Sequence, residues 1–152
     1  MSPYRPTMIG NETRVREILR KIKPLAVEYY QLTGKPLGVT GEVAECAAAE
    51  LLDLTLTPAR TIGHDALRNA ERIQIRGRAR GKKSKGQRVP PVKATAPCDA
   101  VVLVLLDIAT LDALEIWEAK FADVVKRQKR IGGKGLHVSD FKRIARRVWA
   151  TA

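Results

Sequence analysis

Three polar side chains in the middle of the sequence have types and spacing that suit chemistry on a phosphodiester. Gln74 and Arg76 lie two residues apart in a segment where apolar and polar residues alternate, and Asp65 lies in a short extended segment before it. Because alternate residues of a strand point to the same side, Gln74 and Arg76 should face one site, opposite Ile73 and Ile75. Pairing of the two segments would bring Asp65, on the first strand, to that site.

Hydrolysis of a phosphodiester needs a Lewis acid on the phosphate, an activated water and positive charge near the transition state. Magnesium supplies the first two when carboxylate and carbonyl oxygens hold it. Asp65 and Gln74 offer such oxygens, and Glu42, on a preceding helix, adds an acid at the rim. We therefore predict a Mg²⁺ site at Asp65, Gln74 and Glu42, where Mn²⁺ can substitute. Arg76 would bind the scissile phosphate, and Glu45 is a weaker candidate ligand.

These residues also have structural interpretations that need no metal. Asp65 can simply flank a turn, and Gln74 can be a solvated strand residue. Glu42 lies in the first turn of its expected helix, where a negative charge favours the helix dipole. Both interpretations of Glu42 are compatible with each other.

The order of these residues resembles a known family. Glu42 in GEVAECAAAELL, Asp65 in GHDAL and the triplet Gln74-Ile75-Arg76 resemble the PD-(D/E)XK nuclease superfamily, which has the restriction-endonuclease-like fold. There, a helical Glu precedes a strand Asp, and an (E/D/Q)-x-K triplet follows on the neighbouring strand. The resemblance covers roughly residues 40 to 130 and implies an α-β-β-β-α-β core and magnesium-dependent endonuclease activity.

Two positions depart from that pattern. Gln74 stands where most members carry an acid, so its amide oxygen can ligate magnesium but brings no charge. Arg76 stands in place of the lysine; a guanidinium keeps its proton and cannot act as a base, but it can clamp a phosphate with two N–H groups. Nucleic-acid binding can therefore be retained where cleavage is lost.

The net charge indicates a polyanionic partner. The 152-residue chain has a formal net charge of +12, and no acidic residue lies between Arg72 and Pro97. We expect nucleic acid as the partner, DNA more than RNA, contacted by a basic loop at about residues 79–97. The residues expected to bind it are Arg78, Arg80, Lys82, Lys83, Lys85 and Arg88.

The hydrophobic pattern predicts an α/β (α+β) domain with one mixed sheet between helices, and with extra helices at both ends of the family's core. Residues 1–10 would form a flexible arm and residues 11–152 a single domain. The expected elements are a helix from Asn11 to about Gly34 that Pro24 kinks or breaks, a helix Thr40–Leu54 capped by Thr40, short extended segments at Thr55–Thr61 and Gly63–Leu67, strands Glu71–Arg78, Asp99–Asp107 and Leu111–Trp117, a helix Lys120–Arg130, and a last helix Ser139–Trp149 capped by Ser139.

Several classes of protein are not expected. The most apolar segment is interrupted by Asp107 and is too short to span a bilayer, so no membrane partner is predicted. Cys46 and Cys98 are far apart, which favours reduced thiols in a cytoplasmic protein. The alternatives to a nuclease are a non-catalytic DNA-binding module on the same fold and a basic RNA- or ribosome-associated protein. The oligomeric state is left open, with a homodimer among the options.

Overall fold

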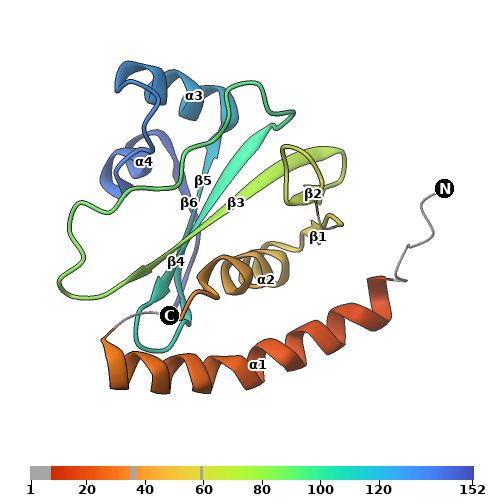
Figure 1. Ribbon diagram of the computed structural model, residues 1–152. Coiled ribbons are helices and arrows are strands. Elements are labelled where there is room, and N and C mark those ends of the chain that lie inside the picture. Colours follow the sequence, from red (N-terminus) through yellow and green to blue (C-terminus); the bar gives the residue numbers. More distant parts are fainter. Residues whose placement is uncertain (1–7, 35–36, 59) are drawn as a thin grey trace.

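The computed structural model describes residues 8–34, 37–58 and 60–152, with only the backbone of residues 8–11. Within these residues the chain is a mixed α/β protein with four helices and a six-stranded sheet (Figure 1). The elements are α1 (Met8–Thr33), α2 (Thr40–Leu52), β1 (Thr55–Leu56), β2 (Ala66–Arg68), β3 (Glu71–Arg80), β4 (Ala100–Asp107), β5 (Ala113–Lys120), α3 (Phe121–Arg130), α4 (Val138–Ile144) and β6 (Arg146–Ala150).

The strands are arranged in sequence order from β1 to β6. Neighbouring strands are antiparallel except β3 and β4, which pair in parallel from Ile73↔Ala100 to Arg80↔Asp107. The apolar run Ala100–Leu106 forms β4 and is buried along its whole length, as expected for a central strand covered on both faces. The expected hairpin between the strands that became β4 and β5 is confirmed.

Each face of the sheet has its own core. Even-numbered residues of β4 such as Val102 pack with α2 residues such as Ala44 on one face. Odd-numbered residues such as Leu103 pack on the other face with α3, α4 and the coil 81–99 that connects β3 to β4. Val89, in the middle of this coil, is buried, so the coil forms part of the layer on that face (Figure 1).

The expected extent of the last helix, Ser139–Trp149, was wrong. The helix ends at Ile144, and the chain then turns at Ala145 into β6, which pairs antiparallel with β5. The expected cap was also wrong, because His137 is the N-cap and no side chain makes a capping hydrogen bond there. The strand forms because β5 would otherwise leave its backbone groups unpaired, and Trp149 packs against the α2 side of the core.

Two further expectations about helices need correction. Thr40 is the first residue of α2 and not its cap; Val39 is the N-cap, without a side-chain hydrogen bond. Helix α1 begins at Met8 and continues through Pro24 without a break. Residues 1–7 of the expected arm lie outside the described residues.

Candidate functional site

Asp65 directs its carboxylate at the backbone of β3. The residue immediately precedes β2 and so lies just outside the strand on which it was expected. Its backbone N–H donates to the Ile73 carbonyl at 2.8 Å, and its own carbonyl accepts from the N–H of Thr57 at 2.8 Å. The side-chain Oδ2 accepts a hydrogen bond from the Ile75 N–H at 2.7 Å. Both strands that flank Asp65 therefore fix its position.

Gln74 is buried, although the sequence also allowed it to be a solvated strand residue. Its side chain is on the β3 face opposite Ile73, but the coil 81–99 covers that face too, and only 6% of Gln74 is exposed. Its Nε2 donates to the Gly63 carbonyl at 2.7 Å, which leaves Oε1 to accept from Arg76. A buried amide with both ends bonded has a single fixed orientation.

Arg76 lies between the two oxygens that the sequence assigned to a metal. Its Nη2 donates to Gln74 Oε1 at 3.2 Å, and its Nη1 is 3.8 Å from Asp65 Oδ2. The same guanidinium donates to the carbonyls of Pro90 and Pro91, at 3.3 and 3.5 Å. The structure thus brings Asp65, Gln74 and Arg76 together, with the guanidinium as the cation of the group.

This arrangement bears directly on magnesium binding. Carboxylate and amide oxygens are suitable ligands for Mg²⁺. However, Asp65 Oδ2 and Gln74 Oε1 both already face N–H groups, and the described residues contain no group of three or more His, Cys, Asp or Glu side chains that could hold a metal ion. In this conformation the residues do not fit a divalent cation.

Glu45, which the sequence favoured less than Glu42 as a metal ligand, lies close enough to Asp65 for the charge of Asp65 to affect its pKa. The pKa of Glu45 is raised from 4.5 to about 7, mainly by partial burial and also by the negative charges of Asp65 and Glu42, while Arg76 opposes the shift. The two glutamates lie three residues apart on α2, so one turn of the helix separates them.

Gly77 sets how close α2 lies to this group. A Cβ atom added to Gly77 would lie 2.5 Å from the Cβ of Ala44, which is too close for any other residue. The glycine on β3 and the alanine on α2 together let the helix pack directly on the strand. This close packing holds Glu45 near Asp65.

A cavity of about 540 Å³ opens beside these residues. It is lined by residues 61–65, by Gln74 and Arg76, and by Pro91, Lys93, Thr95, Ala96 and Pro97 of the coil. His64 borders it, and its buried Nδ1 has no hydrogen-bond partner among the described residues. The cavity therefore combines a carboxylate, an amide, a guanidinium and a lysine.

The six basic residues expected to bind nucleic acid fall into two groups. Arg78, Arg80 and Arg88 each donate to a backbone carbonyl, of Arg88, Ser84 and Gly135 respectively, and so fasten the coil to the rest of the molecule. Lys82, Lys83 and Lys85 are exposed at the start of the coil. The arginines keep their positive charge in these bonds, so the whole segment remains cationic.

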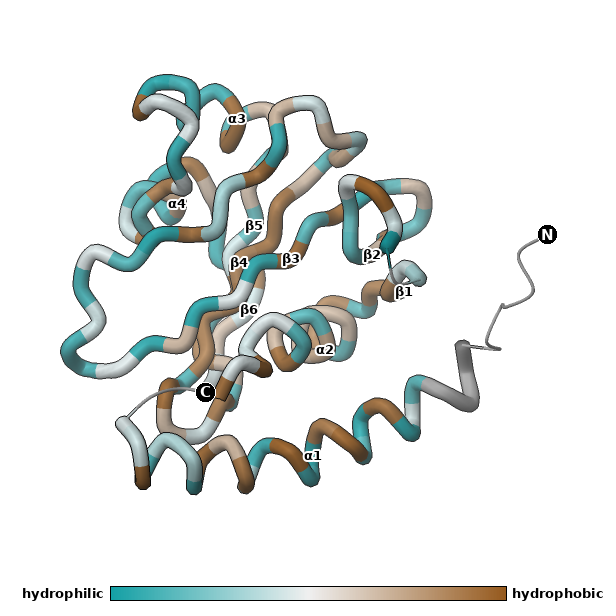
Figure 2. The backbone as a smooth tube through the Cα atoms, in the orientation of Figure 1, coloured by the Kyte–Doolittle hydropathy of each residue, from teal (hydrophilic) through white to brown (hydrophobic). Residues whose placement is uncertain are grey.

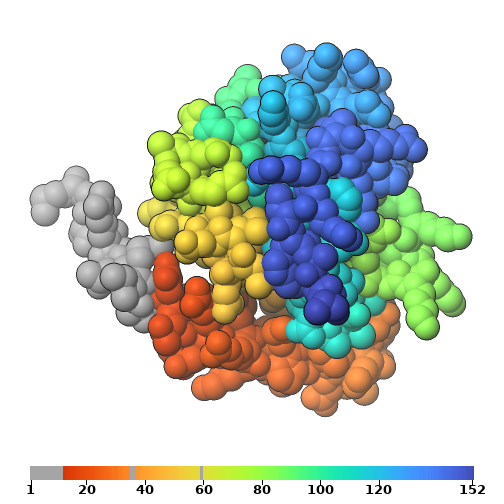
Figure 3. All heavy atoms as spheres, turned by 180° about the vertical axis from the view of Figure 1, so that it is seen from behind, coloured from red at the N-terminus to blue at the C-terminus, as the bar shows by residue number. Residues whose placement is uncertain are grey.

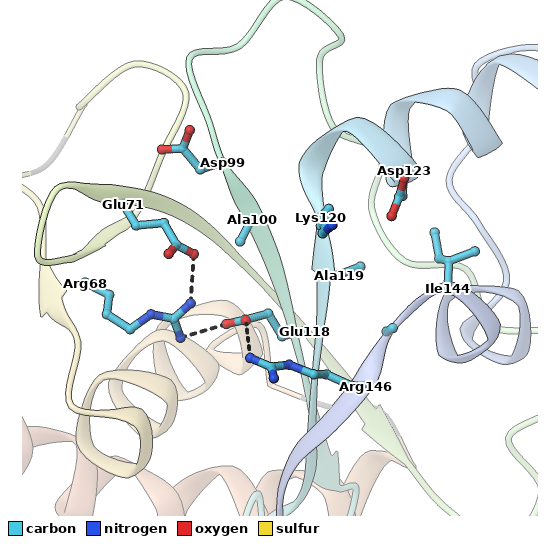
Figure 4. A pocket seen from close by; sticks show the side chains of 11 residues that line it. Arg68, Glu71, Asp99, Ala100, Glu118, Ala119, Lys120, Asp123, Ile144 and Arg146 are labelled. Atoms are coloured by element: carbon cyan, nitrogen blue, oxygen red, sulfur yellow. Dashed lines mark hydrogen bonds and ion pairs between the residues drawn. The ribbon is translucent and has the colours of Figure 1, made fainter.

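A second charged pocket, which the sequence did not indicate, is lined by residues of β2, β3, β5 and β6 (Figure 4). Arg68 donates to Glu71 and to Glu118, each at 2.8 Å, and Arg146 lies 3.5 Å from the other oxygen of Glu118. The pocket has a volume of about 600 Å³. These residues come from three separate parts of the chain, so no local motif could have revealed the cluster.

No helix among the described residues is long and apolar enough to cross a membrane. No protein-family model matches the chain, and no curated protein matches it. The functional assignment therefore rests on the geometry and charge of the site itself.

Proposed function

We propose that this protein binds the phosphate backbone of nucleic acid, DNA rather than RNA, along β3 and the coil 81–97. One observation carries the proposal: the even-numbered side of β3 is a row of polar and basic residues, Gln74, Arg76, Arg78 and Arg80, that joins the cavity at Asp65 to the exposed lysines at 82, 83 and 85. Such a row without intervening acidic residues suits a polyanion.

We further propose that the fold is restriction-endonuclease-like. The elements α2, β2, β3, β4, α3 and β6 follow the α-β-β-β-α-β order of the PD-(D/E)XK superfamily, with α1, β1, β5 and α4 as additions. Asp65, immediately before β2, and Gln74 with Arg76 on the antiparallel neighbour β3 follow the order that the resemblance implies. The order of the elements and the positions of these three residues both support the proposed fold.

In the proposed binding function, Arg76 supplies the positive charge of the site. It holds Asp65 and Gln74 in place, and it tethers Pro90 and Pro91 so that Lys93 stays at the cavity. A phosphate entering the cavity would meet Lys93 and the positive charge of Arg76, whose N–H groups already face Gln74, Asp65 and backbone carbonyls. No metal ion is needed for this role.

Magnesium-dependent cleavage is a second candidate function, favoured by one observation. Burial is the main cause of the raised pKa of Glu45, and the negative charges of Asp65 and Glu42 add to it, so a divalent cation beside these carboxylates would be favoured. If Arg76 moved out, Asp65 and Gln74, with Glu42 or Glu45, would hold Mg²⁺ or Mn²⁺. The ion would supply Lewis acidity and an activated water.

Binding is tested with fluorescently labelled DNA duplex, single-stranded DNA and RNA over a range of salt concentrations. Replacing Lys82, Lys83 and Lys85 with alanine should weaken DNA binding and lower the slope of log affinity against log salt by about 2 to 3. The control replaces three exposed lysines elsewhere, Lys120, Lys126 and Lys129, and removes the same charge. Equal losses in both variants would show that only net charge matters, and tighter RNA binding would support an RNA-associated protein instead.

Cleavage is tested by incubating wild-type protein with plasmid DNA and Mg²⁺ or Mn²⁺. Under the proposed binding function the plasmid stays intact. Nicking or linearisation that Asp65→Ala abolishes would establish the second candidate and show that Arg76 leaves its described position. Nicking that Asp65→Ala preserves would come from a contaminant or another site.

A further inference from the structure

Helix α1 has a regular row of large apolar side chains that the other described residues leave largely exposed. The row consists of Val15, Ile18, Ile22, Leu25, Tyr29 and Leu32, with steps of three, four, three, four and three residues. This is the spacing of the a and d positions of a coiled coil. Except for Ile22, which is half-buried, these side chains are 40% to 79% exposed.

Apart from Val15, which lines a cavity together with residues of α2, the row is distinct from the face by which α1 contacts its own domain. That face contributes Ala26, which is only 4% exposed, with Leu19 packed against the same core. Lys23 forms an ion pair with Asp112 at 2.6 Å. Because each residue of a helix is rotated by about 100° from the one before, the row and the contact face lie about a quarter turn apart.

The position of α1 at the surface of the molecule can be followed in Figures 2 and 3. Hydrophobic residues recur along α1 in Figure 2, and in Figure 3 the helix forms one edge of the molecule, with no other segment on its outer side in that view. A cavity of about 390 Å³ lies between α1 and α2. The helix is thus attached along one side and open along another.

The exposed row is too large to be ordinary surface. Five large apolar side chains on one helix expose roughly a few hundred Å², which in soluble monomers usually marks an interaction site. Two such surfaces together approach the roughly 1,000 Å² of the smallest specific interfaces. The span from Val15 to Leu32 is about 26 Å, or five turns of helix.

We propose that the row is the interface of a homodimer in which two copies of α1 pack antiparallel. Val15 would pack against Leu32 of the second copy, Ile18 against Tyr29, and Ile22 against Leu25 across the two-fold axis. The arrangement is self-complementary, as a two-fold interface requires. This inference does not depend on the proposed nucleic-acid binding.

Charge complementarity selects the antiparallel orientation. The residues that flank the row on its open side include Lys21 and Glu28, both exposed. In the antiparallel pair Lys21 of each copy faces Glu28 of the other, which gives two ion pairs of opposite charge. In a parallel pair the same positions would face Ala26 and Thr33, and neither ion pair would form.

The test measures the mass of the full-length protein in solution by light scattering or sedimentation over a range of concentrations. We expect a wild-type dimer and a monomeric Leu25→Glu variant with unchanged helical content. Gln31→Glu, which adds the same charge on the polar side of α1, should remain a dimer. A wild-type chain that stays monomeric at every concentration, or a Leu25→Glu variant that dimerises as well as wild type, overturns the proposal.

Charge reversal tests the orientation. Lys21→Glu and Glu28→Lys should each weaken the dimer by about tenfold, and the double variant should restore wild-type affinity. Failure of the double variant to restore the dimer would overturn the antiparallel arrangement. Because these measurements use no nucleic acid, they fail or succeed separately from the binding assay.

Discussion

Two charged pockets lie close to the β2–β3 hairpin, and they differ in how their charges are balanced. In the pocket of Figure 4, Glu118 is almost fully buried with 9% of its side chain exposed, and it is met by Arg68 and Arg146. At the pocket beside Asp65, the guanidinium of Arg76 is shared among a carboxylate, an amide and three carbonyls, and Glu45, on α2 and outside the lining of that pocket, has a raised pKa. Glu118 in the first pocket is paired with two cations, whereas Glu45 beside the second pocket is partly buried near the negative charges of Asp65 and Glu42, and Arg76 opposes the resulting rise of its pKa.

This difference separates a structural cluster from a candidate functional one. A buried carboxylate with two cationic partners is stable as it is and offers little to a ligand. A partly buried carboxylate whose pKa is raised, such as Glu45, gains from binding a proton, a cation or the cationic part of a partner. Four changes test whether the two pockets differ in this way.

Glu118→Ala should have the largest effect, and it should act on stability. It would leave Arg68 and Arg146 without their shared carboxylate, and we expect the free energy of unfolding to fall by roughly 2 kcal/mol, because Arg68 retains Glu71. Urea unfolding measures the change. Glu71→Ala is the control, because its ion pair is more exposed; equal losses in the two variants would contradict a structural role centred on Glu118.

Glu45→Gln should remove a pH dependence of stability. The unfolded chain loses the Glu45 proton near pH 4.5 and the folded chain near 7, so between these values the unfolded state binds fewer protons and stability falls as pH rises. Allowing for partial exposure, we expect the variant to be more stable than wild type by about 1–2 kcal/mol at about pH 8 and equal to it below about pH 4.5. Thermal unfolding over this pH range measures it, and Glu50→Gln on the same helix should not change the profile.

Arg76→Lys should make the site beside Asp65 responsive to magnesium. A lysine has no planar fork and cannot occupy the space between Asp65 and Gln74 as the guanidinium does. We expect Mg²⁺ to stabilise this variant by about 1 kcal/mol and to leave wild type unchanged. Thermal unfolding with and without MgCl₂ is the measurement, with Arg78→Lys as the control; magnesium stabilising wild type equally would show that Arg76 does not block the site.

Asp99→Asn should have the smallest effect. Its carboxylate accepts hydrogen bonds from the side chain and backbone of Arg72, which hold its pKa at about 2. The stabilisation is present above the usual aspartate pKa of 3.8 and is lost as pH falls through 2. Comparing the melting temperatures of variant and wild type should give a small difference near neutral pH that disappears in strong acid.

Much of the sheet could be predicted from the sequence because its signals are local. The apolar run of β4 and the alternation of β3 each indicate a strand, and both are confirmed. Strand β6 was not predicted because Arg146 to Ala150 forms a strand only by pairing with β5, about thirty residues earlier. The sequence showed a helical period there, and the tertiary pairing overrode it.

The sequence predicted which residues form the candidate site, but not the contacts that these residues make. Alternation indicated that Gln74 and Arg76 share a face, and the structure places both next to Asp65. The burial of Gln74 depends on the coil 81–99 folding back over β3, which no local pattern encodes. The importance of Glu45 depends on the close approach of α2 at Gly77, which also required the three-dimensional structure.

The two edges of the sheet bear on how the protein behaves at high concentration. The run AVVLVLL in β4 has the composition of a segment that aggregates when exposed. It lies in the interior of the sheet, while β1 at one edge has only two residues and β6 at the other begins with the exposed arginines 146 and 147. Short or charged edges disfavour strand addition by another molecule. We therefore expect the folded protein to resist fibril growth, and truncation before β6 to expose β5 and promote precipitation.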